Sequence, residues 1–175
     1  MTLTLRPAVA GDLMAIGALQ HRSRAEAYRD IVPADALAAE TAEMMGRYWT
    51  ERWSYERDTH QMTVAERAGE PVGFTYLGPH DPAEPDSAGP DVGELYAIHL
   101  DPAEQGRGTG RTLIIDALAK LHARGWRRAV LWVLVENAHA RDFYLRGGWR
   151  PDGAQREGGI GHALTPQLRY ARDLP

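Results

Sequence analysis

The chain has 175 residues, a formal net charge of −4 and no cysteine. This length predicts one domain spanning 1–175. The acidic balance argues against a nucleic-acid partner, and the lack of cysteine excludes disulfides, thiolate metal sites and a cysteine nucleophile. No apolar run reaches the roughly 20 residues of a membrane span, and the stretch before Arg6 is too short for a signal peptide. We therefore expect a cytoplasmic protein with no membrane partner.

The first part of the chain shows one strand pattern and two helix patterns. Residues 3–6 alternate as a short strand. Leucine and isoleucine then recur at helical spacing between about Gly11 and Tyr28, which predicts a first helix. Pro33 suits the first turn of a second helix, which we expect to continue to about Tyr55.

A strand hairpin follows these helices. Residues 61–67 and 72–77 have strand composition, and Ala68-Gly69-Glu70 between them predicts a tight turn. The next segment, 78–93, is rich in proline, glycine and aspartate, so we expect a long acidic loop. This loop is either a lid over a site or a solvated insertion, and we favour the insertion.

The stretch from Glu94 to Arg111 changes pattern twice. Residues 95–100 form an apolar run that favours a strand, and Asp101-Pro102 ends it because proline has no N–H to donate. Three glycines alternate with other residues, and apolar side chains then recur at helical spacing: Gly106, Gly108, Gly110, then Leu113, Ile114, Ala117, Leu118 and Leu121. Strand, glycine-rich loop and helix in this order can bind an anion, because the first helical N–H groups lack partners and carry the positive end of the helix dipole.

Two common phosphate-binding motifs do not fit this loop. A P-loop needs lysine after its last glycine, whereas Arg111 follows Gly110. A dinucleotide fingerprint needs glycine or alanine where Arg111 stands. What is left is Gln105-x-x-Gly108-x-Gly110 behind a strand, or, in the plainer interpretation, a glycine-rich turn without a ligand.

The last part of the chain predicts a buried strand, a helix and two further strands. Residues 129–135 are apolar throughout, as expected of a central strand covered on both faces. A helix begins near Glu136 and ends at Gly147-Gly148. Strand regions run from Trp149 to about Glu157 and from Gln167 to Leu174.

Three of these segments together resemble one family. Gln105-x-x-Gly108-x-Gly110, Asn137-x-x-Ala140-x-x-Phe143-Tyr144 and Gly147-Gly148-Trp149 are similar to motifs of the GNAT superfamily of acyl-CoA-dependent N-acyltransferases, with tryptophan for the usual phenylalanine. Residues 28–33 look like the linker between the first two helices of many members. The resemblance implies an α/β (α+β) fold: one domain with a mixed central sheet of about six to seven strands, helices on both faces, and strands that splay at the cofactor cleft.

The resemblance also implies acetyl-CoA as co-substrate and residues that bind it. Backbone groups of Ile98, His99 and Leu100 would pair with the pantetheine arm, and the Leu100 amide would hold the thioester oxygen. The pyrophosphate would lie on the loop formed by Gln105, Gly106, Arg107, Gly108, Thr109, Gly110 and Arg111. Asn137 would hydrogen-bond the pantetheine region. We interpret His99 as a strand-surface histidine rather than a base.

Two residues suit the chemistry of amine acylation by direct attack. An alkyl amine has a pKa of roughly 10.4, so a base must remove its proton, and Glu94 at the start of the key strand is the candidate. The leaving thiol has a pKa of roughly 8.5, so an acid is useful, and the resemblance gives this role to Tyr144. A half-exposed carboxylate and a core tyrosine are the plainer interpretations of these two residues.

The acceptor is open at this stage. We expect a primary amine of a small molecule or a peptide N-terminus, in a pocket that includes Tyr28 and Ile31. Acidic residues could attract a cationic amine or simply form a solvated face: Glu26, Asp30 and Asp35. No metal is expected, since the other histidines show no metal-binding spacing. Related proteins often dimerise, so a homodimer is also open.

Two alternatives to an enzyme are kept. A non-catalytic acyl-CoA sensor would bind the cofactor without transferring the acyl group, and an interaction protein would have the fold without cofactor affinity. The intact loop between Gln105 and Gly110 argues against the interaction protein.

Overall fold

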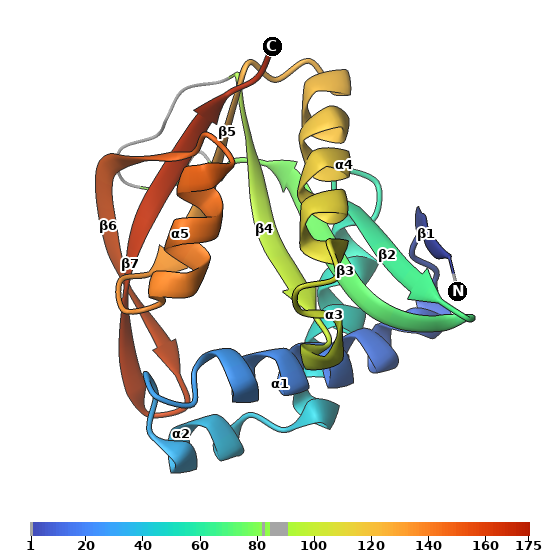
Figure 1. The fold of residues 1–175 in the computed structure, drawn as a ribbon, viewed down its shortest axis with the longest axis vertical. Helices are drawn as coiled ribbons and strands as arrows, with labels where there is room; N and C mark the ends of the chain where they lie inside the picture. The colour runs from blue at the N-terminus through green and yellow to red at the C-terminus, as the bar shows by residue number, and fades with distance from the viewer. Residues whose placement is uncertain (1, 82, 85–90) are drawn as a thin grey trace.

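The computed structural model describes residues 2–81, 83–84 and 91–175. It contains a seven-stranded sheet with the strand order β1-β2-β3-β4-β5-β7-β6 (Figure 1). The strands are β1 (Leu3–Pro7), β2 (Gln61–Arg67), β3 (Glu70–Pro79), β4 (Val92–Leu100), β5 (Arg128–Leu134), β6 (Arg150–Ile160) and β7 (Ala163–Asp173). The helices are α1 (Leu13–Ala27), α2 (Ala34–Ala39), α3 (Ala42–Glu56), α4 (Thr109–Ala123) and α5 (Ala138–Arg146), with short 3-10 turns at Ala10–Asp12 and Pro102–Glu104.

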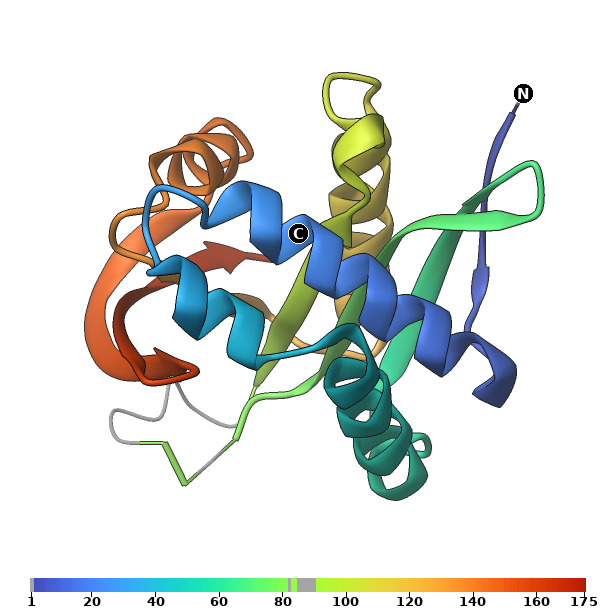
Figure 2. The ribbon, with the colours of Figure 1, turned by 90° about the horizontal axis from the view of Figure 1, so that it is seen from below.

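Two apolar clusters cover the two faces of the sheet. Side chains of α4 and α5 pack with strand residues such as Leu77, Leu95 and Leu131. Side chains of α1 and α3 pack with Phe74 and Tyr76 of β3, whose neighbour Leu77 belongs to the first cluster. Figure 2 shows α4 and α5 on one side of the sheet and α1 and α3 toward the other. The expected mixed sheet with helices on both faces is therefore confirmed.

The predicted hairpin is present, but the predicted second helix is two helices. Ala68 and Gly69 both have positive φ and form the turn between β2 and β3. Glu40 is extended, with φ −97° and ψ 93°, which ends α2. The Thr41 hydroxyl then accepts a 3.2 Å hydrogen bond from the Met44 N–H and begins α3. An N-cap inside a continuous helical pattern thus broke the helix that was expected between Pro33 and Tyr55.

The expected acidic loop is shorter than predicted, because β3 continues to Pro79 and β4 begins at Val92. The choice between a lid and an insertion falls mainly on residues 82 and 85–90, which lie outside the described residues. The last two strands are longer than expected and meet at a turn near Gly161. Among the described residues, no helix has both the length and the apolar character needed to cross a membrane.

The central strands β4 and β5 part after a short parallel stretch. Their pairing consists of Val92 with Arg128, Gly93 with Ala129, and Glu94 with Val130. On its other edge β4 stays paired with β3 as far as Leu100, with a register shift at Tyr96. β4 therefore follows the β3 side while β5 follows β7, and a gap opens between them, as the resemblance implied (Figure 1).

The helices α1 and α3 approach one another at a pair of glycines. A Cβ atom added to Gly17 would lie 2.1 Å from the backbone nitrogen of Gly46. Since that contact is with backbone, no side-chain rotation can relieve it. Residues of both helices line the cleft described below, so the close approach also sets how far apart these lining residues lie.

We predict that Gly17→Ala destabilises the fold by about 1–3 kcal/mol or more, the usual cost of overpacking. Gly11→Ala is the matched control, since an added Cβ there meets nothing within 4 Å. Thermal unfolding measures both variants. Equal melting temperatures would contradict the close packing of α1 on α3.

Candidate functional site

A cleft of about 990 Å³ lies where β4 and β5 part. Its walls come from α1, α3, β4, β5 and α5, and its lining includes buried polar side chains. Residues that the sequence analysis singled out line it together: Tyr28, Glu94, Ile98, His99, Leu100, Gln105, Gly110, Asn137 and Tyr144. Segments far apart in the chain thus meet in one cavity.

The other predicted residues lie beside this cleft or away from it. The loop before α4 and the first turn of α4 contain those that do not line the cavity: Gly106, Arg107, Gly108, Thr109 and Arg111. Ile31 packs instead against the small cluster formed by Val32, Ala36, Leu134 and Ile160. Among the acids considered for attracting an amine, Glu26 lines the cleft, while exposed Asp35 bonds His162.

Backbone groups of β4 face the cleft because of strand geometry. The Asp101 N–H donates to the Val72 carbonyl on β3 at 2.9 Å. N–H groups of successive residues in a strand point to opposite edges. The N–H groups of Leu100 and Ile98 are therefore directed away from β3, toward the side where β5 has parted.

The glycine-rich loop is shaped by left-handed backbone. Gly106 has φ +74° and Gly108 has φ +82°, a conformation that side chains other than glycine rarely adopt. Gly108 is the N-cap of α4, so the first N–H groups of this helix lie at the loop. The helix dipole and the exposed Arg111 make this end of the cleft electropositive.

Glu104 fixes the glycine-rich loop through hydrogen bonds with Arg107 and Thr109, a role that the sequence analysis did not predict. Its side chain is buried and accepts hydrogen bonds from Arg67 at 2.9 Å, Arg107 at 3.0 Å and the Thr109 hydroxyl at 2.7 Å. The bonds to Arg67 lower the pKa of Glu104 to about 2 against the cost of burial. In the sequence, nothing distinguishes this acid from a solvated residue of the loop.

Glu94 is the buried carboxyl group at the point where the strands part. Its residue is 2% exposed, and burial raises its pKa, which the hydrogen bond from His80 opposes. The His80 Nδ1 lies 2.9 Å from Glu94 Oε2. The ligand atoms of His80, Glu84 and Glu94 all lie within 4.8 Å of one another, a grouping that could hold a metal ion. The expected absence of a metal stays a prediction.

Two tyrosines line the cleft: Tyr28, which follows α1, and Tyr144 on α5. Tyr144 is buried, and burial raises its pKa, so the phenol keeps its proton at neutral pH. Burial also raises the pKa of Tyr28, and the charge of each phenol would disfavour ionisation of a close neighbour. The ring of Tyr144 packs edge-on against Trp149 and Tyr170, which fixes its position.

His99 lies in the cleft wall and is only half-buried, but its imidazole stays neutral. Ser23 Oγ is 3.1 Å from His99 Nδ1, and Phe74 stacks on the ring with a centroid distance of 5.6 Å. Burial lowers the pKa of His99 to about 3. The residue is thus on the strand surface but partly covered by α1, and a base of such low pKa is a poor match for an amine.

Asn137 begins α5 and lines the cleft at the same time. Its side-chain oxygen accepts a 3.2 Å hydrogen bond from the Ala140 N–H. The carboxamide nitrogen is then the donor that Asn137 can offer a ligand. This N-cap explains why an asparagine stands three residues before an alanine in the motif.

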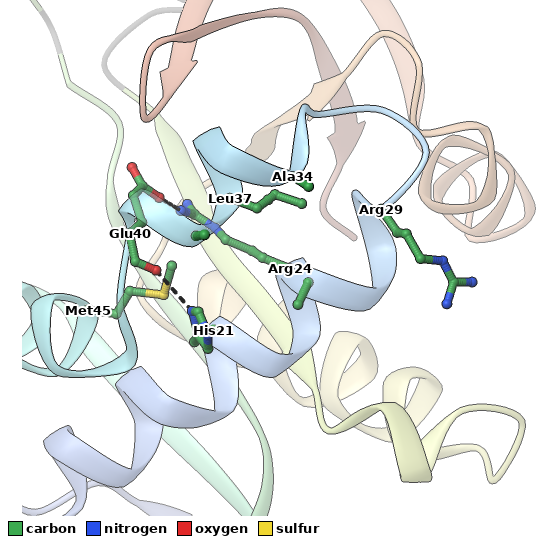
Figure 3. Close-up of a pocket in the computed structure, with 9 residues that line it drawn as sticks. His21, Arg24, Arg29, Ala34, Leu37, Glu40 and Met45 are labelled. Atoms are coloured by element: carbon green, nitrogen blue, oxygen red, sulfur yellow. Dashed lines mark hydrogen bonds and ion pairs between the residues drawn. The ribbon is translucent and has the colours of Figure 1, made fainter.

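A smaller cavity of about 300 Å³ lies beside the cleft, between α1, α2 and the start of α3 (Figure 3). An ion pair of 2.7 Å joins Arg24 on α1 to Glu40 in the break between α2 and α3. His21 Nδ1 lies 2.9 Å from the Glu40 carbonyl oxygen. These contacts attach the helix break to α1, and Arg24, Glu40 and Met45 line both cavities.

Comparison with known proteins agrees with this geometry. The model of the Acetyltransferase (GNAT) family matches residues 25–149. Mycothiol acetyltransferase of Amycolatopsis mediterranei is 40% identical over 86 residues, which cover 49% of this chain and 29% of that protein. An uncharacterized N-acetyltransferase of Methanocaldococcus jannaschii is 37% identical over 101 residues, 58% of this chain and 44% of that protein. The chain thus spans less than half the length of these curated relatives.

The fold is shared with a solved structure over almost its whole length. The PaiA N-acetyltransferase of Thermoplasma acidophilum, solved in complex with coenzyme A, matches with a TM-score of 0.80 at 15% identity, covering 99% of each chain. Because the family model covers residues 25–149, well over half of the sequence, this chain belongs to the GNAT family of acetyltransferases.

We predict that Glu104→Gln lowers the melting temperature at pH 7 by about 2–4 °C, the shift that a loss of ~1 kcal/mol produces in a domain of this size. The pKa of Glu104 falls from 4.5 to about 2 on folding. Its stabilisation is therefore complete above pH 4.5 and is lost as the pH falls through about 2.

The control is Glu43→Gln, which removes an exposed ion pair with Arg47 on α3. Thermal unfolding between pH 3 and pH 7 should show a Glu104 effect that shrinks toward acid and a Glu43 effect near zero at every pH. A Glu104 effect that does not change with pH would contradict the assignment.

Proposed function

We propose that this chain is an N-acetyltransferase that transfers the acetyl group of acetyl-CoA to a primary amine by direct attack. The observation that carries the proposal is the cleft itself. It combines a buried carboxyl group, a protonated buried phenol and an unpaired strand edge in one cavity beside a glycine-rich helix start. Family membership supports acetyl-CoA as the donor.

In this proposal the cofactor lies along β4. The pantetheine arm takes the place that β5 would occupy, and it bonds the outward backbone groups of Ile98 and Leu100. The Leu100 N–H then holds the thioester oxygen as it gains negative charge. The diphosphate lies on the N–H groups between Gln105 and Arg111, where the left-handed glycines keep side chains out of the way. Asn137 donates to the pantetheine from the opposite wall.

Glu94 serves as the base. An amine entering the cleft is protonated at neutral pH, and it attacks the thioester carbonyl only after losing that proton. A carboxylate whose pKa is raised by burial is a stronger base than an exposed one, and it loses activity as the pH falls through that raised value. The proton of the amine moves to a Glu94 oxygen, and the nitrogen lone pair forms the new C–N bond.

Tyr144 serves as the acid. When the C–S bond breaks, the sulfur of coenzyme A leaves as a thiolate with a conjugate-acid pKa of roughly 8.5. The protonated phenol of Tyr144 lies on α5, in the wall opposite the acceptor helices, and can give its proton to that sulfur. Its fixed ring means that little reorganisation is needed when the charge develops.

The acceptor end of the cleft is formed by α1 and α3. Tyr28, Tyr48 and Arg52 line it together with Trp132 and Arg156 from the sheet. Both arginines are already paired, Arg52 with Glu56 at 2.7 Å and Arg156 with Glu84 at 2.8 Å. A pocket of this size and mixed polarity suits a small polar amine or a peptide N-terminus.

The direct test is release of coenzyme A thiol from acetyl-CoA with a panel of amines, peptides and polyamines. We expect Glu94→Gln and Tyr144→Phe each to lower kcat by roughly 10²- to 10⁴-fold. Calorimetry should give an unchanged Kd for acetyl-CoA, because neither side chain holds the diphosphate or the β4 backbone.

The matched controls are Glu51→Gln and Tyr55→Phe, both on exposed positions of α3. They should leave kcat unchanged. Acetyl-CoA binding without thiol release for any amine would replace the enzyme with an acyl-CoA sensor, and full activity in both cleft variants would refute the two assigned roles.

A further inference from the structure

His80 is buried between the candidate base and a second carboxylate. It follows β3 directly, and its backbone N–H donates to the Val92 carbonyl at 3.1 Å, which fixes it beside the start of β4. Its residue is 6% exposed. On one side Nδ1 lies 2.9 Å from Glu94 Oε2, and on the other Nε2 lies 4.0 Å from Glu84 Oε2. Among the described residues, Nε2 has no hydrogen-bond partner.

Glu84 is itself held in place. Its Oε2 accepts from the indole N–H of Trp132 at 3.2 Å, and its Oε1 accepts from Arg156 at 2.8 Å. Trp132 comes from β5 and Arg156 from β6, so Glu84 is connected to the half of the sheet that parts from β4. His80 therefore lies in a chain of polar contacts that runs from Glu94 on β4 to Trp132 on β5 and Arg156 on β6.

We propose that His80 is a positioning residue for Glu94, which it keeps ionised and oriented so that one carboxylate oxygen faces the cleft, while the Glu84 carboxylate lies on the other side of the imidazole. This inference rests on the proposed function for the role of Glu94 as base. It adds two residues that were not among the predicted site residues and that lie outside the part of the cleft formed by helices.

The hydrogen-bond chemistry supports an imidazole that donates from Nδ1 to Glu94. An ionised carboxylate only accepts, so Nδ1 must carry a proton for the 2.9 Å contact with Glu94 to be a hydrogen bond. That bond occupies Oε2 and leaves Oε1 for the amine. Nε2 faces Glu84 Oε2 at 4.0 Å, so a carboxylate lies on each side of the ring.

The charges around Glu94 act in opposite directions. Burial and the Glu84 carboxylate raise the pKa of Glu94, whereas His80 and Arg156 lower it. Of these described groups, His80 is the one that contacts Glu94 directly, through the 2.9 Å hydrogen bond. Without His80, burial would act with less opposition, the pKa of Glu94 would rise further, and more of the carboxyl group would be protonated at a given pH.

A divalent cation is the competing explanation for the same three side chains, since their ligand atoms lie within 4.8 Å. The hydrogen-bond arrangement favours positioning. The two nitrogens of the ring face two different carboxylates, and the Glu84 oxygens already bond Trp132 and Arg156. A cation bound by all three side chains would have to share Glu84 with these two donors and replace the hydrogen bond between His80 and Glu94.

The test compares His80→Leu, which has no donor, with His80→Asn, which keeps an N–H donor near the position of Nδ1. In His80→Leu we expect kcat at pH 7 to fall about tenfold, and the acid limb of the pH–rate profile to move up by about one pH unit, the effect of losing one charge-assisted hydrogen bond. His80→Asn should recover part of both. The KM for acetyl-CoA should not change.

The control is His162→Leu, which removes an exposed contact with Asp35 away from the cleft and should leave the profile unmoved. Melting temperatures and acetyl-CoA calorimetry verify that each variant is folded. An acid limb that does not move in folded His80→Leu overturns the proposal. So does loss of wild-type activity on chelation that Zn²⁺ restores, because it would make the site a metal centre.

A second readout does not depend on turnover. The Glu94 carboxyl carbon, assigned by its loss in Glu94→Gln, can be titrated by ¹³C NMR in the wild type and in His80→Leu. We expect its midpoint to rise in the variant. If no amine is acetylated, the proposed function fails, whereas an unmoved midpoint refutes the positioning role whether or not the chain is an enzyme.

Discussion

The structure depends on how few residues join β4 to β5. Three parallel pairs hold the two halves of the sheet together, and the last of them is Glu94 with Val130. Beyond this pair β4 stays with β3 and β5 stays with β7, so the backbone groups of Leu95 to Leu100 on the open edge have no neighbouring strand. Unpaired strand edges bind extended ligands, and this one faces a cavity lined by α1, α3 and α5. In the proposed function, the parting of the strands therefore provides both the wall that binds the cofactor and the space for an acceptor.

Two buried glutamates illustrate how surroundings decide a role. Glu104 has two arginines and a threonine hydroxyl as donors, so its pKa falls to about 2, and it fixes the glycine-rich loop as a permanent anion. Glu94 is as deeply buried but has one imidazole beside it, and its pKa rises. A carboxylate with several charged donors stays ionised and acts as a structural anion, whereas burial with fewer donors raises the pKa and makes the carboxylate a stronger base.

Local patterns in the sequence predicted most of the fold. The strand, loop and helix around Gly106 to Gly110 and the hairpin at Ala68-Gly69 follow from glycine and from hydrophobic period, which are short-range signals. The break at Glu40 was missed, because a threonine cap interrupts a pattern that is helical on both sides.

His80 and Glu104 could not be recognised from the sequence for a different reason. His80 meets Glu94 only through the register of β3 on β4, where Gly78 pairs with Glu94, and this register is not encoded in any short motif. Glu104 lies in the turn before α4, and its partner Arg67 is the last residue of β2, far away in the sequence. Family motifs in the sequence predicted the candidate residues of the cleft. Their supporting partners, His80 and Glu104, could be identified only from the structure.

The central claim is that the open edge of β4 and the glycine-rich loop bind coenzyme A. Amide ¹H–¹⁵N spectra of the labelled chain titrated with coenzyme A test it directly, with pantetheine, which lacks the diphosphate, as the comparison. We predict that coenzyme A shifts the amides of Ile98, Leu100 and Gly106 to Gly110, and that pantetheine shifts Ile98 and Leu100 alone. Saturating coenzyme A that leaves the amides of Leu100 and Gly106 to Gly110 unmoved would contradict it.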